Sequence, residues 1–262
     1  MPSPTPKPKP GRLLLLDIGN THCHVGVATP HRLLKHADVP TRDLLEGPGG
    51  GSLERWTHTP GVAQAVICSV VPAATIQART LLQHRLGRDP LVLTSDTLRG
   101  VGLEYPKPAS IGPDRLANAI AARAMFEVPC VVVDFGTAVT FDIVDRRGCY
   151  VGGIIAPGLA AMTDYLHEKT ALLPRIRIRS VQTHIGRSTE EAMLIGAVHG
   201  YRGLVRELIR GLRRQLRSPR LPVVATGGYA RLLARGLPEI TCVRPNLTLE
   251  GLRLLWGHHQ EA

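Results

Sequence analysis

Two short stretches of the chain combine a carboxylate, a glycine and a hydroxyl residue directly after an apolar run. In the first, Asp17–Thr21 (DIGNT) follows Leu13–Leu16, and in the second, Asp134–Thr137 (DFGT) follows Cys130–Val133. Glycine leaves backbone N–H groups open to close approach by an anion, and a carboxylate beside such groups suits a metal-bound polyphosphate. The first turn alone is equally compatible with an ordinary hairpin, because Asn and Gly are frequent in such turns.

A third carboxylate, Asp114, lies in the segment Tyr105–Arg115 (YPKPASIGPDR). Pro113 suits the first turn of a helix, which we predict to run through Phe126. Its helical periodicity comes from Leu116, Ile120 and Ala124. Asp114 would then lie near a helix N-terminus, where the helix dipole favours the ionised carboxylate. On these residues alone, a structural role at the helix start is the simpler interpretation.

The elements around these residues alternate between strands and helices. Each of the two turns leads into a second apolar run, so each is predicted to join a hairpin. Ala65–Val71 is predicted as a buried strand, with a helix over Ala73–Arg85 and a short strand at Leu91–Leu93. This alternation predicts an α/β fold. Two hairpins of one construction indicate two similar lobes that face each other across a cleft.

A long helix is predicted to begin at Ser188, because Ser188 and Glu191 have the spacing of a capping box. Leucines follow at four-residue intervals, at Leu204, Leu208, Leu212 and Leu216. Glycines on the same helix would let another backbone approach, either in the core or across a dimer interface; they are Gly196, Gly200 and Gly203.

Two shorter patterns lie between the second hairpin and this helix. Arg175–Arg179 (RIRIR) alternates strictly, which predicts a half-exposed strand with a solvated basic face. Pro157-Gly158 is interpreted as simple turn chemistry.

Composition is that of a folded protein: 262 residues, 44% of them hydrophobic and 20% charged, which is enough to bury a core in one large or two modest domains. The five cysteines are scattered without a C-x-x-C pair, as expected for reduced thiols. No apolar run is long enough for a membrane span, and no signal peptide is evident. We therefore expect a cytoplasmic protein.

The net charge of +11 is compatible with a nucleic-acid partner or with attraction of small anions such as ATP. Aromatic residues make up only 4% of the chain, which leaves few stacking platforms for single-stranded nucleic acid. The composition therefore favours a solvated basic surface and small anionic ligands.

The two hairpins, followed by Ala225–Ala230 (ATGGYA), resemble the acetate and sugar kinase, heat-shock 70 and actin superfamily. Within it, Ile111–Arg115 (IGPDR) and Ile185–Thr189 (IGRST) are similar to motifs of type III pantothenate kinases. Smaller agreements are Ser69–Pro72, Gly152–Gly158, Leu172–Pro174 and Leu247–Leu252. The resemblance covers nearly the whole chain after Arg12.

The resemblance implies an α/β fold of two ribonuclease-H-like lobes, as in actin-like ATPases. The lobes expected from it are an N-terminal lobe (12–118) and a C-terminal lobe (119–262). Residues 1–11, rich in Pro and Lys, are expected from their composition to form a disordered extension. A homodimer is also implied, with the pantothenate site close to the subunit interface.

The resemblance further implies ATP-dependent phosphorylation of pantothenate, the entry step of coenzyme A synthesis. ATP would contact Thr137 and the whole first turn, which comprises Asp17, Ile18, Gly19, Asn20, Thr21, His22, Cys23 and His24. Asp17 would orient Mg²⁺, through water, and Asp134 would support a monovalent cation, K⁺ or NH₄⁺.

By the same resemblance Asp114 takes the proton from the substrate hydroxyl. The residues expected at the substrate are Tyr105, Gly112, Pro113, Asp114, Arg115 and Thr189. Pro113 stands where the family has a small Ala; we expect the backbone to tolerate the proline and local substrate contacts to shift. Two alternatives remain open: a non-enzymatic transcription accessory factor on the same scaffold, and a small sugar kinase.

Overall fold

The computed structural model describes residues 11–45 and 51–261. All but the last residue of the expected Pro- and Lys-rich extension lie outside the described residues.

Contacts divide the chain into two compact units that are not contiguous in sequence. Unit 1 holds residues up to Gly100, Lys107–Ala121 and Thr248–Ala262, and unit 2 holds Val101–Pro106 and Ala122–Leu247. Helix α4 (Pro113–Met125) is therefore shared between the units, and the last helix joins unit 1 although the expected C-terminal lobe contained it. The lobe boundary at residue 118 stays a prediction.

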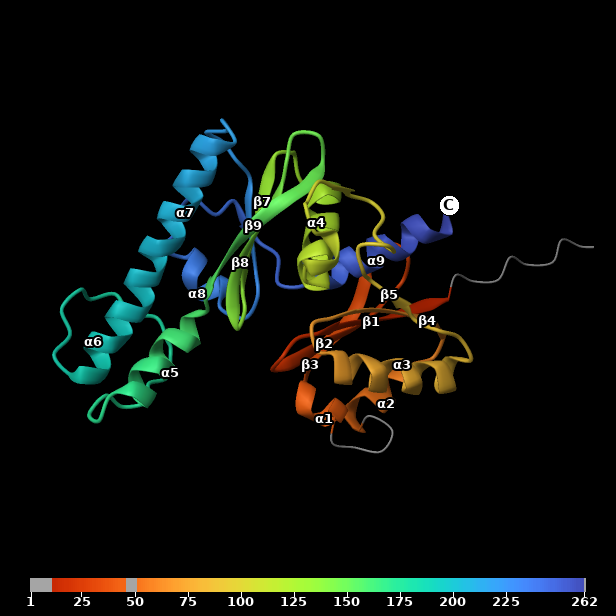
Figure 1. Ribbon diagram of the computed structural model, residues 1–262. Helices are drawn as coiled ribbons and strands as arrows, with labels where there is room; N and C mark the ends of the chain where they lie inside the picture. The colour runs from red at the N-terminus through yellow and green to blue at the C-terminus, as the bar shows by residue number, and fades with distance from the viewer. Residues whose placement is uncertain (1–10, 46–50, 262) are drawn as a thin grey trace, which may run out of the picture. The chain divides into compact units, whose positions relative to one another are not determined.

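Unit 1 is built on a five-stranded sheet in the order β3-β2-β1-β4-β5 (Figure 1). The strands are β1 (Arg12–Ile18), β2 (His22–Ala28), β3 (Leu33–Pro40), β4 (Val62–Ser69) and β5 (Leu91–Val92). β1, β2 and β3 are antiparallel neighbours, whereas β4 is parallel to β1 and β5 to β4. The predicted first hairpin and the two later strands are confirmed.

The helices of unit 1 pack on both faces of this sheet. They comprise α1 (Thr41–Leu45), α2 (Glu54–Thr57), α3 (Pro72–Leu86), α4 and α9 (Leu247–Gln260), with short 3₁₀ turns at Gly51–Leu53 and Pro108–Ser110. One face buries Leu14, Leu16 and Ile18 against residues of α1, α2 and α3. On the other face α9 meets β2, because a Cβ on Gly26 would lie 3.1 Å from Leu249 Cδ1. α4 packs closely against α9, because a Cβ on Gly251 would lie 2.0 Å from the Ala117 carbonyl oxygen.

Unit 2 repeats the same strand arrangement with one addition. Its sheet has the order β11-β10-β7-β8-β9-β6. The strands are β6 (Gly102–Leu103), β7 (Cys130–Phe135), β8 (Ala138–Val144), β9 (Cys149–Pro157), β10 (Val223–Thr226) and β11 (Cys242–Val243). β7, β8 and β9 are antiparallel, and β10 and β11 are parallel to β7, as β4 and β5 are to β1. The predicted α/β fold with two similar sheets is confirmed.

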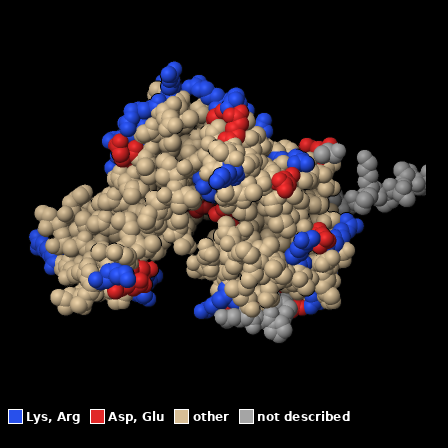
Figure 2. All heavy atoms as spheres, in the orientation of Figure 1, with Lys and Arg blue, Asp and Glu red and all other residues tan. Residues whose placement is uncertain are grey.

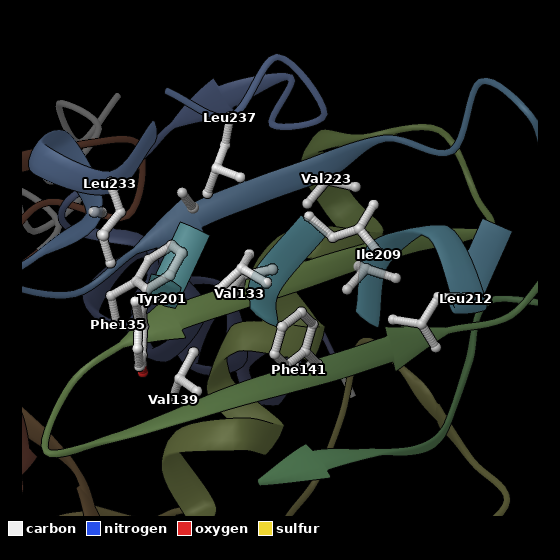
Figure 3. Packing of buried hydrophobic residues seen from close by; sticks show 14 of the residues in the cluster. Val133, Phe135, Val139, Phe141, Tyr201, Ile209, Leu212, Val223, Leu233 and Leu237 are labelled. Carbon is white, nitrogen blue, oxygen red and sulfur yellow. The ribbon is translucent and has the colours of Figure 1, made fainter. Parts of the chain in front are cut away.

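The helices of unit 2 are α5 (Leu159–Lys169), α6 (Thr189–Ile195), α7 (Tyr201–Gln215) and α8 (Ala230–Ala234), and a π-helical turn at Gly196–Gly200 joins α6 to α7. The core forms where α7 and α8 cover the sheet (Figure 3). Phe135 and Phe141 from the second hairpin lie there with Tyr201 and Ile209 from α7.

The helix predicted from Ser188 is confirmed, with a modified buried stripe. Ser188 Oγ accepts the Glu191 N–H at 3.1 Å, as the capping spacing predicts. The fully buried residues of α7 are Tyr201, Val205, Ile209 and Leu212, whereas Leu204, Leu208 and Leu216 are only partly buried. In a helix of 3.6 residues per turn, each four-residue step drifts by about 40° around the axis. The leucine series begins beside the buried stripe and therefore meets its centre only in part.

Two expectations for unit 2 need correction. Residues 175–179 form no strand and pair with neither sheet of the described chain. Alternation alone did not suffice, because a strand also needs a neighbour to take its backbone hydrogen bonds. Among the described residues, no atom outside the helix's own backbone lies within 4 Å of a Cβ placed on Gly196, Gly200 or Gly203. These glycines therefore serve no close approach in the core of this chain, and their use at a dimer interface stays a prediction.

Among the described helices, none has both the length and the apolar character needed to cross a membrane.

Candidate active site

The first hairpin turn is held by its own backbone and by the start of α1. The Gly19 N–H donates to the His22 carbonyl at 3.0 Å, and a Cβ on Gly19 would lie 3.1 Å from that oxygen. Thr41 Oγ1 donates to the Gly19 carbonyl at 2.7 Å, and the Thr41 N–H donates to the Thr21 carbonyl at 3.0 Å. Asn20, Thr21 and His22 remain exposed at the tip. The turn is therefore fixed in shape while its tip stays open to solvent.

Asp17 lies in a polar row that crosses four strands of the first sheet. Asp38 on β3 is opposite His24 on β2, His24 is opposite Asp17 on β1, and Asp17 is opposite Cys68 on β4. Opposite residues on neighbouring strands share a face of the sheet. His24 Nδ1 and Asp38 Oδ1 are 2.6 Å apart, and the Cys68 thiol donates to Asp17 Oδ1 at 3.2 Å.

Asp114 is the second residue of α4, and its carboxylate folds back over the chain before it. Asp114 Oδ1 accepts the Arg115 N–H at 2.9 Å. A Cβ on Gly112 would lie 2.5 Å from the same oxygen and 3.7 Å from Val70 Cγ1. A side chain on Gly112 would therefore displace the Asp114 carboxylate from its present position.

Burial sets the electrostatics of Asp114. Loss of hydration raises the pKa of this carboxyl above its ordinary value, and the Arg115 N–H and guanidinium lower it in part. Burial also raises the pKa of the Cys68 thiol, and the charges of Asp17 and then Asp114 raise it further. Unit 1 therefore brings Asp17, Cys68 and Asp114 within electrostatic reach of one another.

The second hairpin turn is built like the first, and Gly158 packs closely against its backbone. The Gly136 N–H donates to the Ala138 carbonyl at 3.0 Å. A Cβ on Gly158 would lie 2.2 Å from the Thr137 carbonyl oxygen and 2.6 Å from that of Gly136. The interpretation of Pro157-Gly158 as simple turn chemistry is therefore wrong, because Gly158 allows the start of α5 to contact this turn.

Asp134 lies beneath the later glycine turn of unit 2. A Cβ on Gly227 would lie 2.4 Å from Asp134 Oδ1, and Gly227 has φ +88°, a conformation that favours glycine. The Tyr229 N–H donates to the Phe135 carbonyl at 3.3 Å. Residues 227–229 thus lie directly against the strand end that carries Asp134.

Two further residues expected at the substrate belong to unit 2. The ring of Tyr105 lies 6.1 Å from that of Tyr150 and over Gly152, where a Cβ would lie 3.7 Å from Tyr105 Cε2. Thr189 follows the N-cap Ser188 at the start of α6 and is exposed. Tyr105 is held by packing, whereas Thr189 is positioned by the helix cap.

The carboxylates fit the cations that the family resemblance implies. Mg²⁺ keeps several waters and binds proteins through one or two carboxylates together with substrate phosphates. Asp17, at a strand end beside an exposed turn, offers such a ligand. Among the described residues, no group of three or more His, Cys, Asp or Glu side chains could hold a metal. A cation here would therefore depend on phosphate oxygens for the rest of its shell.

Three residues shape these turns in ways that sequence reasoning did not find: Thr41 and Cys68 were missed, and Gly158 was interpreted as simple turn chemistry. None carries a local signal, because each is made relevant by a residue distant in the sequence. The register Asp17 to Cys68 exists only once β1 and β4 are paired.

Comparisons with known proteins agree with this architecture. The family model for type III pantothenate kinase matches residues 13–211. A type III pantothenate kinase of Akkermansia muciniphila is 46% identical over 245 residues, covering 93% of this chain and 98% of the relative. One from Methylacidiphilum infernorum is 41% identical over 245 residues, with 93% and 87% covered.

Solved structures support the fold at much lower identity. A Campylobacter jejuni protein assigned to the Baf family of transcriptional activators has a TM-score of 0.58 at 18% identity, over 95% of this chain and all (100%) of that one. MreB 5 of Spiroplasma citri, bound to AMPPNP, has a TM-score of 0.50 at 12% identity, over 97% and 98%. These likenesses confirm the actin-like fold. Because the family model matches most of this chain, residues 13–211, the chain belongs to the type III pantothenate kinase family.

Proposed function

We propose that the protein transfers the γ-phosphoryl group of ATP to the primary hydroxyl of pantothenate, the first step of coenzyme A synthesis. The observation that carries this proposal is the arrangement of Asp114, a partly buried carboxylate with a raised pKa, in the same unit as the Asp17 turn. Family membership supplies the substrate class.

Asp114 acts as the general base. Its carboxylate accepts the proton of the pantothenate hydroxyl while the hydroxyl oxygen bonds to the γ-phosphorus, and the bond to the β-phosphate oxygen breaks to release ADP. A raised pKa makes the carboxylate a better proton acceptor, and the neighbouring Arg115 limits that rise so that the ionised form persists. Gly112 permits the carboxylate to fold back into this position.

The first turn binds the phosphates of ATP. Phosphoryl transfer depends on alignment and charge neutralisation more than on covalent chemistry. The contacts of Thr41 with Gly19 and Thr21 prepare the turn before the nucleotide arrives. The second turn, which carries Thr137, contacts ATP in the same manner and is held by Gly158. Mg²⁺, when bound near Asp17, neutralises phosphate charge during transfer.

Asp134 supports a monovalent cation, K⁺ or NH₄⁺. Its carboxylate lies under the Gly227 turn and would supply an oxygen ligand to such a cation. A second cation offsets charge that Mg²⁺ leaves on the phosphates. Arg115, Tyr105 and Thr189 orient pantothenate. Pro113 stands where the family has a smaller residue and shifts local contacts with the substrate.

The protein is a homodimer. Large apolar side chains remain exposed on α5 and on the segments before and after it. We name this set the α5 apolar face; its members are Ile155, Met162, Tyr165, Leu166, Leu172 and Ile185. Leu172 is 90% exposed and Tyr165 62%. Exposed apolar surface of this kind indicates an interface. The open glycines Gly196, Gly200 and Gly203 would let a partner subunit approach the neighbouring helix, since α5 contacts the π turn.

An ATP-dependent assay tests the proposal directly. ADP release is measured with pantothenate and with a panel of hexoses and N-acetylhexosamines, and the phosphorylated product is identified by mass. Pantothenate is expected to be the one acceptor turned over. Turnover of a sugar with none on pantothenate would replace the substrate assignment, and no turnover of any acceptor would favour a non-enzymatic role.

A further inference from the structure

Cys68 is the nearest hydrogen-bonding neighbour of Asp17 on β4. The thiol is fully buried at the carboxyl end of β4, and its sulfur lies 3.2 Å from Asp17 Oδ1. The register of the parallel pair places the two residues directly opposite each other. The contact therefore depends on two strand backbones, not on a flexible loop.

Only a neutral donor suits this position. The Cys68 sulfur lies within donating distance of Asp17 Oδ1, and a neutral thiol donates a hydrogen there without competing for cations. A lysine would neutralise Asp17 and remove its attraction for a metal. A thiol can hold the carboxylate without changing its charge.

We propose that Cys68 is a positioning residue, whose S–H donation fixes the rotation of the Asp17 carboxylate for the Mg²⁺ complex of ATP. The inference rests on the proposed function, because it assigns a role to a side chain behind that same site. Groups behind a metal-binding carboxylate orient it, and their removal costs about 10- to 100-fold in metal affinity or activity.

The competing explanation is packing alone. A buried thiol fills space as a small apolar group would, and its removal leaves a cavity. Packing predicts a loss of stability with unchanged use of Mg²⁺. Positioning predicts a change in the Mg²⁺ requirement that a hydroxyl in place of the thiol repairs.

Three variants separate these explanations: Cys68→Ala, Cys68→Ser and, as the matched control, Cys130→Ala. Cys130 is also fully buried on a strand, but burial alone raises its pKa, to about 12, and no carboxylate contributes. Two Mg²⁺ titrations are carried out. The first gives the Mg²⁺ concentration at which turnover is half-maximal. In the second, ATP is present and the melting temperature is measured, which gives the Mg²⁺ concentration that produces half of the rise due to ATP.

For Cys68→Ala we expect both Mg²⁺ concentrations to rise about tenfold. For Cys68→Ser and Cys130→Ala we expect wild-type values. Equal Mg²⁺ dependence in Cys68→Ala and wild type would overturn the proposal, as would a serine variant no better than the alanine one. Should the wild type fail to phosphorylate pantothenate, the proposed function fails, while the melting measurement still judges Cys68.

A spectroscopic test uses the wild-type fold and holds even if Cys68→Ala does not fold. The S–H stretching band of Cys68 is assigned as the band absent from Cys68→Ser. A hydrogen bond to a carboxylate lowers its frequency, so Asp17→Asn is expected to move the band upward. A band that does not respond to Asp17→Asn would overturn the proposal.

Discussion

At the scale of single residues, the chemistry is set by how much water each carboxylate loses. Asp114 and Asp17 are both partly buried in unit 1. Asp114 has its pKa raised by burial and lowered in part by Arg115. Asp17 instead accepts a thiol hydrogen. The raised pKa supports the proposed role of Asp114 as a base, and the thiol contact supports the proposed role of Asp17 as a ligand.

Asp114→Asn keeps the shape of the side chain and removes its ability to take a proton. We expect kcat to fall about 10²- to 10⁴-fold with ATP affinity unchanged, since general-base contributions lie in that range. Turnover and ATP affinity are measured on one preparation. A folded variant with near wild-type turnover would remove Asp114 from the mechanism.

Stability of the same variant separates catalysis from helix capping. Because the folded-state pKa of Asp114 is raised, its contribution to stability is present below the unfolded-state pKa and is lost as the pH rises through the folded-state pKa. Asp114→Asn is therefore expected to unfold at an equal or higher temperature than wild type at neutral pH. A purely capping role predicts a loss of about 0.5–2 kcal/mol instead.

Arg115 is expected to control the acidic limb of the pH–rate profile. Its positive charge lowers the pKa of Asp114, so Arg115→Gln raises that pKa further and moves the acidic limb of kcat to higher pH. Arg115→Lys, which keeps the charge, is the control and leaves the limb near its wild-type position. A limb that is unchanged in Arg115→Gln would mean that another group governs it.

Asp134 is expected to give the enzyme its dependence on K⁺ or NH₄⁺. Wild-type rates are compared in potassium, in sodium and in a bulky organic cation at matched ionic strength, with Mg²⁺ constant. We expect potassium to be faster, and Asp134→Asn to lose that difference, because the carboxylate provides the charge that retains the cation. Equal wild-type rates in all three salts would contradict the assignment.

At the scale of elements, each unit presents a hairpin turn that a neighbouring element fixes from outside. Thr41 at the start of α1 holds the first turn by two hydrogen bonds. Gly158 at the start of α5 lies against the second, and Tyr201 Oη donates to the Pro157 carbonyl at 2.9 Å just before it. The second turn is therefore linked to α7, whose buried stripe anchors the core.

Gly158→Ala is expected to damage the second turn. Its Cβ would lie 2.2 Å from the Thr137 carbonyl oxygen, a backbone atom that cannot rotate away. Overpacking of this kind costs about 1–3 kcal/mol, and the displaced turn should raise the KM for ATP. Melting temperature and KM are measured together.

The control for Gly158→Ala is Gly257→Ala. Among the described residues, no atom lies within 4 Å of a Cβ on Gly257, which is in the interior of α9. This variant should gain up to about 1 kcal/mol of stability from helix propensity. Equal behaviour of the two variants would show that the turn tolerates displacement.

At the scale of the whole molecule, much of the net charge of +11 is used locally. Figure 2 shows Lys and Arg side chains gathered around the C-terminal end of α7. Arg202 donates to the carbonyls of Leu232 and Leu233, and Arg206 pairs with the buried Glu239 at 3.2 Å. These arginines satisfy the carbonyl ends of α8 and the loop after it. A structural role therefore accounts for part of the basic surface.

The α5 apolar face is expected to close the homodimer. Tyr165→Asp combined with Leu172→Asp places charge in that interface and should give a monomer by light scattering at assay concentration. Ile76→Asp is the control, because Ile76 is 68% exposed on α3, outside this face. A wild-type monomer with full activity would refute the dimer.

Local sequence patterns predicted most of the elements around the candidate residues. Apolar runs followed by Asp-x-Gly predicted both hairpins, and Pro113 and Ser188 marked the helix starts that the structure has. These signals are local, since a turn, a proline or a helix cap affects the backbone of only a few neighbouring residues. The order of the motifs along the chain also indicated the protein family.

The contacts that hold those residues in place became visible in the tertiary structure alone. The thiol opposite Asp17, the hydroxyl that holds Gly19 and the glycine beneath Thr137 each join segments far apart in the chain. Strand register and helix approach create these contacts, and neither is written in a local pattern. For the same reason the alternating Arg175–Arg179 failed as a strand: its pattern specified two faces but no neighbouring strand to pair with.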